Sequence, residues 1–113
     1  MQNITQNKIH LNKKTDKNYP LAYQKGFIYF NDLKISVNKN VLIPRIETED
    51  ITRYIVEYVN NNALYKNKII KILEVGTGSG CISIDLATKI TNSSITAIDV
   101  SSKALQVAQF NAK

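Results

Sequence analysis

The feature that most constrains the fold of this chain is a glycine-rich segment between an apolar run and a helical pattern. Residues 69–75 read IIKILEV, a β-branched run typical of a buried parallel strand. The next five residues are GTGSG, with glycines at positions 76, 78 and 80. Glycines allow a sharp turn and let main-chain amides approach a ligand closely. The segment therefore predicts a strand, a ligand-binding turn and a helix in succession.

The residues after this loop repeat the alternation of helix and strand. A helix is expected over residues 80–90, a strand over 94–100 (SITAIDV), and a last helix with Ser101 as its N-cap. The residues expected to face inward from the two helices are Ile82, Leu86, Ile90, Ala104, Leu105, Ala108 and Ala112. The order strand, helix, strand, helix predicts an α/β fold whose strands are parallel and joined by a right-handed crossover.

Two further elements are expected before the loop. Residues 25–37 read KGFIYFNDLKISV, and Asn31 and Asp32 can adopt the positive φ of a tight turn, which predicts a β-hairpin. From Glu47 to Asn62 the apolar residues recur at helical spacing. This stripe consists of Ile51, Tyr54, Ile55, Tyr58 and Val59. We expect its two tyrosines to lie in the core.

Composition excludes several classes of site. The chain has 113 residues with one cysteine, Cys81, so neither a disulfide framework nor a cysteine-type zinc site can form within it. The one histidine, His10, argues against a Ser-His-Asp triad, and we expect it to be exposed and inert. The net charge of +6 lies mostly in the first 40 residues, without arginine runs or aromatic platforms. Direct nucleic-acid binding is therefore not favoured.

The glycine loop and a following acid indicate a nucleotide-type cofactor. Asp99 ends the second strand, where a carboxylate accepts hydrogen bonds from ribose hydroxyls in doubly wound folds. The dinucleotide fingerprint GxGxxG requires glycine where this chain has Cys81, and no Lys-Ser or Lys-Thr follows the loop as in a Walker A motif. The pattern ExGxGxG is instead typical of S-adenosylmethionine binding. Dinucleotide binding and a ligand-free turn remain the alternatives.

Several motifs in order resemble one enzyme family. Residues 41–49 read VLIPRIETE, 74–82 read EVGTGSGCI, 99–112 contain DxSxxALxxAxxNA, and 20–30 contain PxxYxxGxxxF. Over residues 19–113 the chain thereby resembles the methyltransferases that modify a glutamine of peptide chain release factors. It departs from their VLIPRPETE signature only at Ile46.

This resemblance implies a fold and a cofactor site. The fold is part of a Rossmann-like class I methyltransferase with a parallel sheet, preceded by a β-hairpin. The expected units are a polar tail over residues 1–18, the hairpin and VLIPR segment over 19–45, and the first part of the cofactor domain over 46–113. By the same resemblance, Glu74 holds the methionine ammonium group and Asp99 binds the ribose hydroxyls of S-adenosylmethionine. The loop that lines the methionine and ribose consists of Gly76, Thr77, Gly78, Ser79 and Gly80.

The resemblance assigns this chain only the cofactor half of the reaction. The family's catalytic NPPY motif lies further along the sequence, and here prolines occur only at positions 20 and 44, so no catalytic residue and no metal ligand is assigned. The implied partner is a release factor with its Gly-Gly-Gln loop, in cytoplasmic translation termination. No apolar run approaches the ~20 residues of a membrane span, so no membrane association is expected. The alternatives are part of an N6-adenine nucleic-acid methyltransferase, a non-catalytic module that binds cofactor, and an unstable remnant.

Three other residues lie in or beside these motifs, namely Arg45, Glu47 and Cys81. Arg45 and Glu47 either border the cofactor or substrate pocket, or serve as an ion-pair partner and a helix-start charge. Cys81 is expected to be a packing residue rather than a redox centre.

Overall fold

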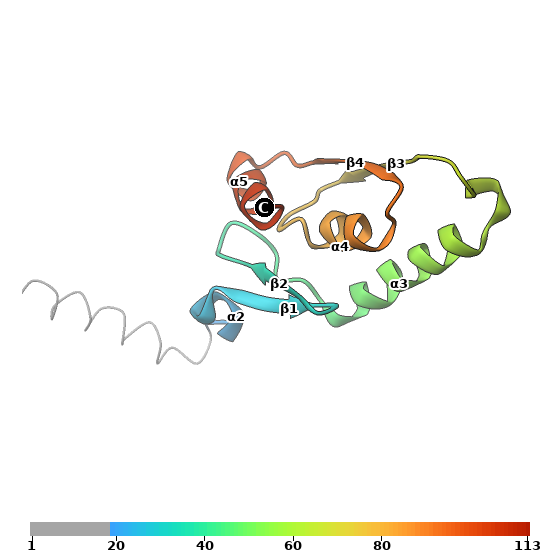
Figure 1. Ribbon diagram of the computed structural model, residues 1–113. Coiled ribbons are helices and arrows are strands. Elements are labelled where there is room, and N and C mark those ends of the chain that lie inside the picture. The colour runs from blue at the N-terminus through green and yellow to red at the C-terminus, as the bar shows by residue number, and fades with distance from the viewer. Residues whose placement is uncertain (1–18) are drawn as a thin grey trace, which may run out of the picture.

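The computed structural model describes residues 19–113. The expected polar tail over residues 1–18, with His10, lies outside the described residues. The elements in chain order are α2 (Leu21–Lys25), β1 (Phe27–Phe30), β2 (Leu33–Ser36), α3 (Ile46–Asn61), the 3-10 helix η1 (Ala63–Tyr65), β3 (Ile70–Val75), α4 (Cys81–Lys89), β4 (Ser93–Ile98) and α5 (Ser102–Asn111). In Figure 1 the β3–β4 sheet lies above helices α4 and α5, and the β1–β2 hairpin lies below them.

The hairpin forms where the sequence predicts it. Strands β1 and β2 pair antiparallel, with Phe30 opposite Leu33. The two residues between them, Asn31 and Asp32, have φ values of 44° and 71°. Both residue types tolerate the left-handed region better than other non-glycine residues, so this dipeptide closes a tight hairpin. Helix α2, which precedes the hairpin, was not expected from the sequence.

The predicted parallel pairing is also confirmed. Strands β3 and β4 pair in register from Ile70 opposite Ser93 to Val75 opposite Ile98. Both strands therefore end at the same edge of the sheet, where the glycine loop follows β3 and Asp99 follows β4. The fold is thus of the predicted α/β class, and its parallel pairing brings the glycine loop beside Asp99.

The main hydrophobic core lies between the hairpin and helices α4 and α5. Phe30 and Ile35 are each only 1% exposed, and they belong to one buried cluster with residues of both helices. Its members are Phe30, Ile35, Val37, Val41, Cys81, Ala104 and Val107. Of the expected inward-facing helix residues, Leu86, Ile90, Ala104 and Ala108 are buried, Ile82 and Leu105 are half-buried, and Ala112 is exposed. The hairpin is thus part of the packing that supports the helices below the sheet.

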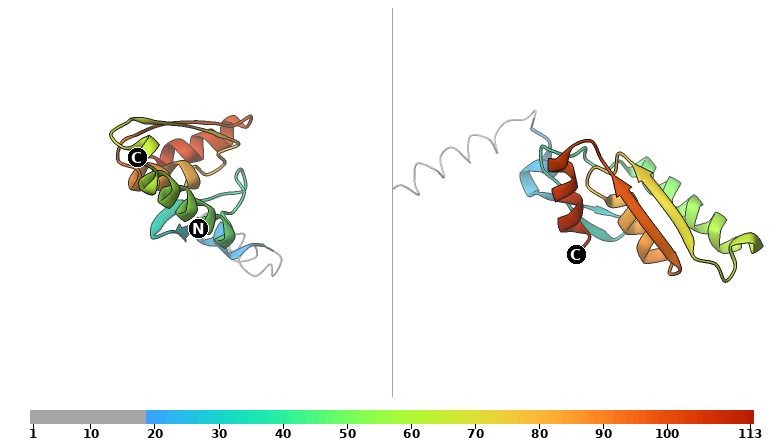
Figure 2. Two further views of the ribbon diagram at one scale, coloured as in Figure 1. Left: turned by 90° about the vertical axis from the view of Figure 1, so that its right-hand side faces the viewer. Right: turned by 90° about the horizontal axis from the view of Figure 1, so that it is seen from above.

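Strand β3 was expected to be buried, and this is correct for one face only. Exposed and half-buried residues alternate along both strands, and Leu73 and Val75 remain 63% and 74% exposed. The second view in Figure 2 shows β3 and β4 side by side, with no element of residues 19–113 over their outer face. The sequence pattern of a doubly covered strand is present, but the described residues supply a cover for only one side.

The expectation that Tyr54 and Tyr58 lie in the core is wrong. They are 67% and 51% exposed, although they stack on each other with ring centroids 6.4 Å apart. Helix α3 instead buries Thr52 completely. Helix α3 contacts α4. Of its apolar stripe, Ile55 and Val59 are half-buried, whereas Ile51, Tyr54 and Tyr58 are exposed, so the described residues cover only one side of the stripe.

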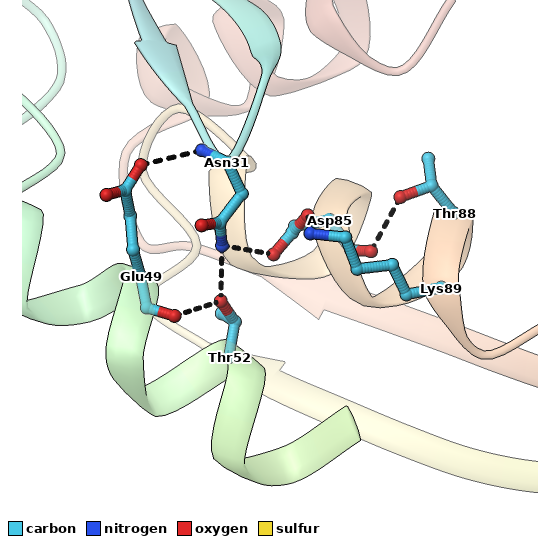
Figure 3. Close-up of polar contacts among 6 residues, drawn as sticks. All are labelled: Asn31, Glu49, Thr52, Asp85, Thr88 and Lys89. Carbon is cyan, nitrogen blue, oxygen red and sulfur yellow. Dashed lines mark hydrogen bonds and ion pairs between the residues drawn. The ribbon is translucent and has the colours of Figure 1, made fainter. Parts of the chain in front are cut away.

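A buried polar junction holds α3, α4 and the hairpin turn together (Figure 3). The side-chain amide of Asn31 donates hydrogen bonds to Thr52 and to Asp85, each at 2.8 Å. The backbone N–H of Asn31 donates to Glu49 at 2.7 Å. Asp85 has no exposed surface, and its other carboxylate oxygen pairs with Lys89 at 2.7 Å. Because a buried carboxylate is costly without partners, these bonds explain how Asp85 is accommodated.

Candidate functional site

The glycine loop is bound to the end of the neighbouring strand. The backbone N–H groups of Gly76 and Thr77 donate to the carbonyl of Ile98 at 2.8 and 3.0 Å. The N–H of Gly80 donates to the carbonyl of Thr77 at 2.9 Å, which closes the loop just before α4 begins. The loop, the end of β4 and the start of α4 therefore meet at one edge of the sheet. The free N–H groups and dipole of a helix N-terminus suit an anionic group at such an edge.

Asp99 is tied to the loop by its own carboxylate. Its Oδ2 accepts a hydrogen bond from the N–H of Gly78 at 2.9 Å, and its Oδ1 accepts one from Ser101 at 2.9 Å. The hydrogen bond from Ser101, followed by that from Gly78, lowers the pKa of Asp99 below its ordinary value. The side chain is thus ionised at neutral pH. A carboxylate accepts about four hydrogen bonds, so capacity remains for ribose hydroxyls.

Glu74 lies beneath the loop on the covered face of β3. Its Oε1 accepts hydrogen bonds from the hydroxyls of Thr77 and Ser83, at 2.7 and 2.6 Å. The sequence pattern did not mark Ser83, because nothing in the residue type distinguishes it from other helical serines. Both bonds end on the same oxygen, which leaves Oε2 for a cation such as an ammonium group. Glu74 therefore links strand, loop and helix as well as offering a charge.

The two other polar loop residues have buried side chains. Thr77 is 4% exposed and Ser79 is 2% exposed. Both residues are almost inaccessible as a whole, whereas Gly76 is exposed and Gly78 is half-buried, so the accessible surface of the loop lies at these two glycines. The structure thus brings all seven sequence-predicted residues to one edge of the sheet. Glu74 lies near the end of β3, residues 76–80 form the loop after β3, and Asp99 follows β4.

The glycines of the loop differ in their surroundings. All three have positive φ, and a Cβ added at Gly76 or Gly78 would meet no atom within 4 Å. A Cβ at Gly80 would lie 3.2 Å from the side chains of Ala108 and Ile84. Gly76 and Gly78 thus leave open space in which a ligand can approach the main chain, whereas Gly80 permits close packing against α5. This division fits a cofactor seated on the first half of the loop.

Cys81 lies directly after the loop and is 7% exposed. Burial is the main cause that raises the pKa of its thiol above the ordinary value, and the charge of Glu74 adds to it. A raised pKa keeps the sulfur protonated, so the environment disfavours a nucleophilic role. Cys81 belongs to the hydrophobic cluster, which confirms the expectation that it is a packing residue.

Arg45 and Glu47 border a different hollow. An open groove of about 680 Å³ lies between Pro20, Tyr23 and the segment over residues 42–47. Both charged residues are exposed, and Arg45 forms no ion pair within residues 19–113. The structure does not bring Arg45 or Glu47 into contact with the glycine loop.

One residue that reaches the loop carried no assigned role in the sequence. Asn111, near the end of α5, donates from its side-chain amide to the carbonyl of Ser79 at 2.8 Å. It also bonds both backbone groups of Ser36, at 2.8 and 2.9 Å. These partners lie 32 and 75 positions away in sequence, so no local pattern indicates the contact.

No helix of residues 19–113 is long and apolar enough to cross a membrane.

Comparison with known proteins finds similar sequences among methyltransferases. Residues 66–113 match a family model described as a methyltransferase domain. The chain is 48% identical over 93 residues to a release factor glutamine methyltransferase of Flavobacterium psychrophilum, covering 82% of this chain and 32% of that protein. It is 41% identical over 103 residues to the release factor glutamine methyltransferase of Lactococcus lactis, covering 91% of this chain and 36% of that protein. A bifunctional methyltransferase of Rickettsia bellii is 38% identical over 117 residues, covering 85% of this chain and 21% of that protein. The chain thus spans about a third of the release factor enzymes that it matches.

Proposed function

This chain is a homologue of one segment of the release factor glutamine methyltransferases, and on that premise we propose that it forms their cofactor-binding part. The cofactor is S-adenosylmethionine, and the reaction it serves is methylation of the side-chain amide of a release factor glutamine. The observation that carries the proposal is the bond between Asp99 and Gly78, because it joins the predicted ribose acceptor to the predicted methionine loop. This bond supports the proposal that the two sequence signals serve one site.

The residues present fit such a cofactor. The open space beside Gly76 and Gly78 admits a ligand to the main chain, and the remaining acceptor positions of Asp99 suit the two ribose hydroxyls. Both hydrogen bonds to Glu74 end on Oε1, which supports the proposed role of its Oε2 in holding the methionine ammonium group. S-adenosylmethionine supplies an electrophilic methyl group, and the chain's contribution is to bind and orient it.

Methyl transfer also needs groups that this chain does not contain. An amide nitrogen is a weak nucleophile, so its orientation and the exclusion of water carry most of the catalysis. By the family resemblance those groups belong to an NPPY motif, which is absent from these 113 residues. The proposed role of these 113 residues is therefore cofactor binding, and the groups that would orient the amide are not among them.

A chimeric enzyme tests this function. Residues 19–113 would replace the matching segment of the Flavobacterium psychrophilum enzyme, which supplies the remaining part. We expect the chimera to methylate a release factor and not adenine in duplex DNA, and the same chimera with Asp99→Ala to lose most of this activity. A folded chimera that transfers no methyl group to the release factor would overturn the proposal. Transfer to DNA alone would favour the adenine methyltransferase alternative.

A further inference from the structure

We propose that Asn111 is a positioning residue of the cofactor site, which fixes the second half of the glycine loop and couples it to the β1–β2 hairpin. The inference rests on the proposed function, because the loop is taken to bind S-adenosylmethionine. Asn111 itself need not touch the cofactor. It acts through the backbone of Ser79, whose carbonyl accepts its hydrogen bond at 2.8 Å.

The two halves of the loop are held in different ways. Gly76 and Thr77 are bound to Ile98, and Gly78 is bound to Asp99, so β4 and its end fix the first half. The peptide unit between Ser79 and Gly80 has other partners. Its N–H donates to the carbonyl of Thr77 at 2.9 Å, and its carbonyl accepts from Asn111. Asn111 thus restrains the peptide plane from which α4 starts.

This peptide plane needs restraint because a glycine follows it. Gly80 has a φ of 85°, and glycine can leave that region at little cost. A rotation of the plane would redirect both the Ser79 carbonyl and the Gly80 N–H, and with them the first N–H groups of α4. Those groups are the ones that a helix N-terminus offers to a ligand.

The other contacts of Asn111 connect the loop to the hairpin. Its Oδ1 accepts from the N–H of Ser36 at 2.8 Å, and its Nδ2 donates to the carbonyl of Ser36 at 2.9 Å. The side-chain amide therefore pairs with the edge of β2 much as a neighbouring strand would. The Ser36 N–H can only donate, which fixes Oδ1 on that side and leaves Nδ2 for the two carbonyls.

Asparagine is well suited to these three bonds. Aspartate has the same shape and can still accept from Ser36, but it cannot donate to either carbonyl. Alanine removes all three bonds. Since both partners of Asn111 are backbone groups, only a change at Asn111 itself removes the link.

The test compares three variants of the 113-residue chain. Asn111→Ala and Asn111→Asp remove the link to Ser79. Asn31→Ala is the matched control, because it removes side-chain bonds between the hairpin and a helix but has no contact with the loop. All are studied at a temperature at which far-UV circular dichroism shows them folded.

Two readouts are measured on each variant. Calorimetry with S-adenosylmethionine is expected to show binding weakened about tenfold in both Asn111 variants and unchanged in Asn31→Ala. Amide hydrogen exchange without ligand is expected to show faster exchange at Gly80 in the Asn111 variants only. If Asn111→Ala does not fold, both measurements can still be made on Asn111→Asp.

The outcomes separate this inference from the proposed function. Failure of the wild-type chain to bind S-adenosylmethionine would contradict the proposed function, while exchange at Gly80 would still decide whether Asn111 holds the loop. Unchanged exchange at Gly80 in Asn111→Asp would overturn the inference, whatever the ligand does. If Asn31→Ala weakens binding as much as the Asn111 variants do, Asn111 contributes only to general stability. That result would also overturn the inference.

Discussion

The Oδ2 atom of Asp99 lies 2.9 Å from the backbone nitrogen of Gly78 and accepts its hydrogen bond. The contact joins the end of β4 to the middle of the glycine loop after β3. The carboxylate of Asp99 therefore has two roles. It is expected to bind ribose, and it stabilises the loop. The pH dependence of stability can report the second role without any ligand.

Asp99→Asn is predicted to lower the stability of the chain in a pH-dependent way. The pKa of Asp99 is lowered from 3.8 in the folded state, so its stabilising effect is complete above that value. As the pH falls through the lower, folded-state pKa, the carboxylate is protonated and the contribution disappears. Urea unfolding of both proteins from neutral pH downward should show a constant difference that shrinks only below pH 3.8. A difference that grows on acidification would contradict this assignment.

Gly80→Ala is predicted to be more destabilising than Gly26→Ala. The two glycines have nearly equal φ values, 85° and 86°, so alanine at either position bears a similar left-handed strain of about 1–2 kcal/mol. Only at Gly80 does the new methyl group also meet Ala108 and Ile84, at 3.2 Å. We expect an additional loss of about 1–3 kcal/mol for Gly80→Ala in urea unfolding. Equal losses would show that α5 does not pack tightly on the loop.

The polar junction of the hairpin turn gives a third prediction. Asn31→Ala removes the bonds to the buried Asp85 and Thr52, and should lower the free energy of unfolding by about 1–3 kcal/mol. Asn31→Gly serves as the control, because glycine adopts the φ of 44° without strain yet lacks the same bonds. We expect the glycine variant to remain clearly less stable than wild type in thermal and urea unfolding. Wild-type stability in Asn31→Gly would mean that turn geometry alone matters.

The thiol of Cys81 is predicted to react slowly while the chain is folded. Burial raises its pKa above 9.0, so little thiolate exists at neutral pH and the sulfur is also inaccessible. Reaction with an aromatic disulfide reagent should be slow in buffer and fast in denaturant. Rapid labelling of the native chain at neutral pH would contradict the packing role.

The raised pKa of Cys81 also means that the free energy of unfolding falls as the pH rises through 9.0, because the thiol of the unfolded chain ionises first.

Local patterns predict the elements well and their partners less well. The hairpin at Asn31 and Asp32, the parallel strands and the cap at Ser101 follow from residue preferences over a few positions, and the Ser101 hydroxyl does accept from Ala104 at 3.1 Å. The stripe containing Tyr54 was also identified, but periodicity shows which face is apolar and not whether the described chain covers it.

The candidate site shows the same division between local and long-range information. The glycine loop and Asp99 are marked by residue type and by their place after strands. The contacts of Asn31 with Asp85 and of Asn111 with Ser36 join residues 54 and 75 positions apart. Such pairs depend on how the hairpin packs against the helices, which a single sequence does not show. The domain boundaries over residues 1–18, 19–45 and 46–113 stay predictions.

The most direct test of the central claim is calorimetric titration of the 113-residue chain with S-adenosylmethionine, beside Asp99→Ala and NAD as a competing ligand. We predict saturable binding of S-adenosylmethionine, no binding of NAD, and a loss of affinity of about tenfold or more in Asp99→Ala. The same titration of Asn31→Ala, whose change lies away from the loop, should match wild type. A folded chain that does not bind S-adenosylmethionine, or binds it equally well without the Asp99 carboxylate, would contradict the account.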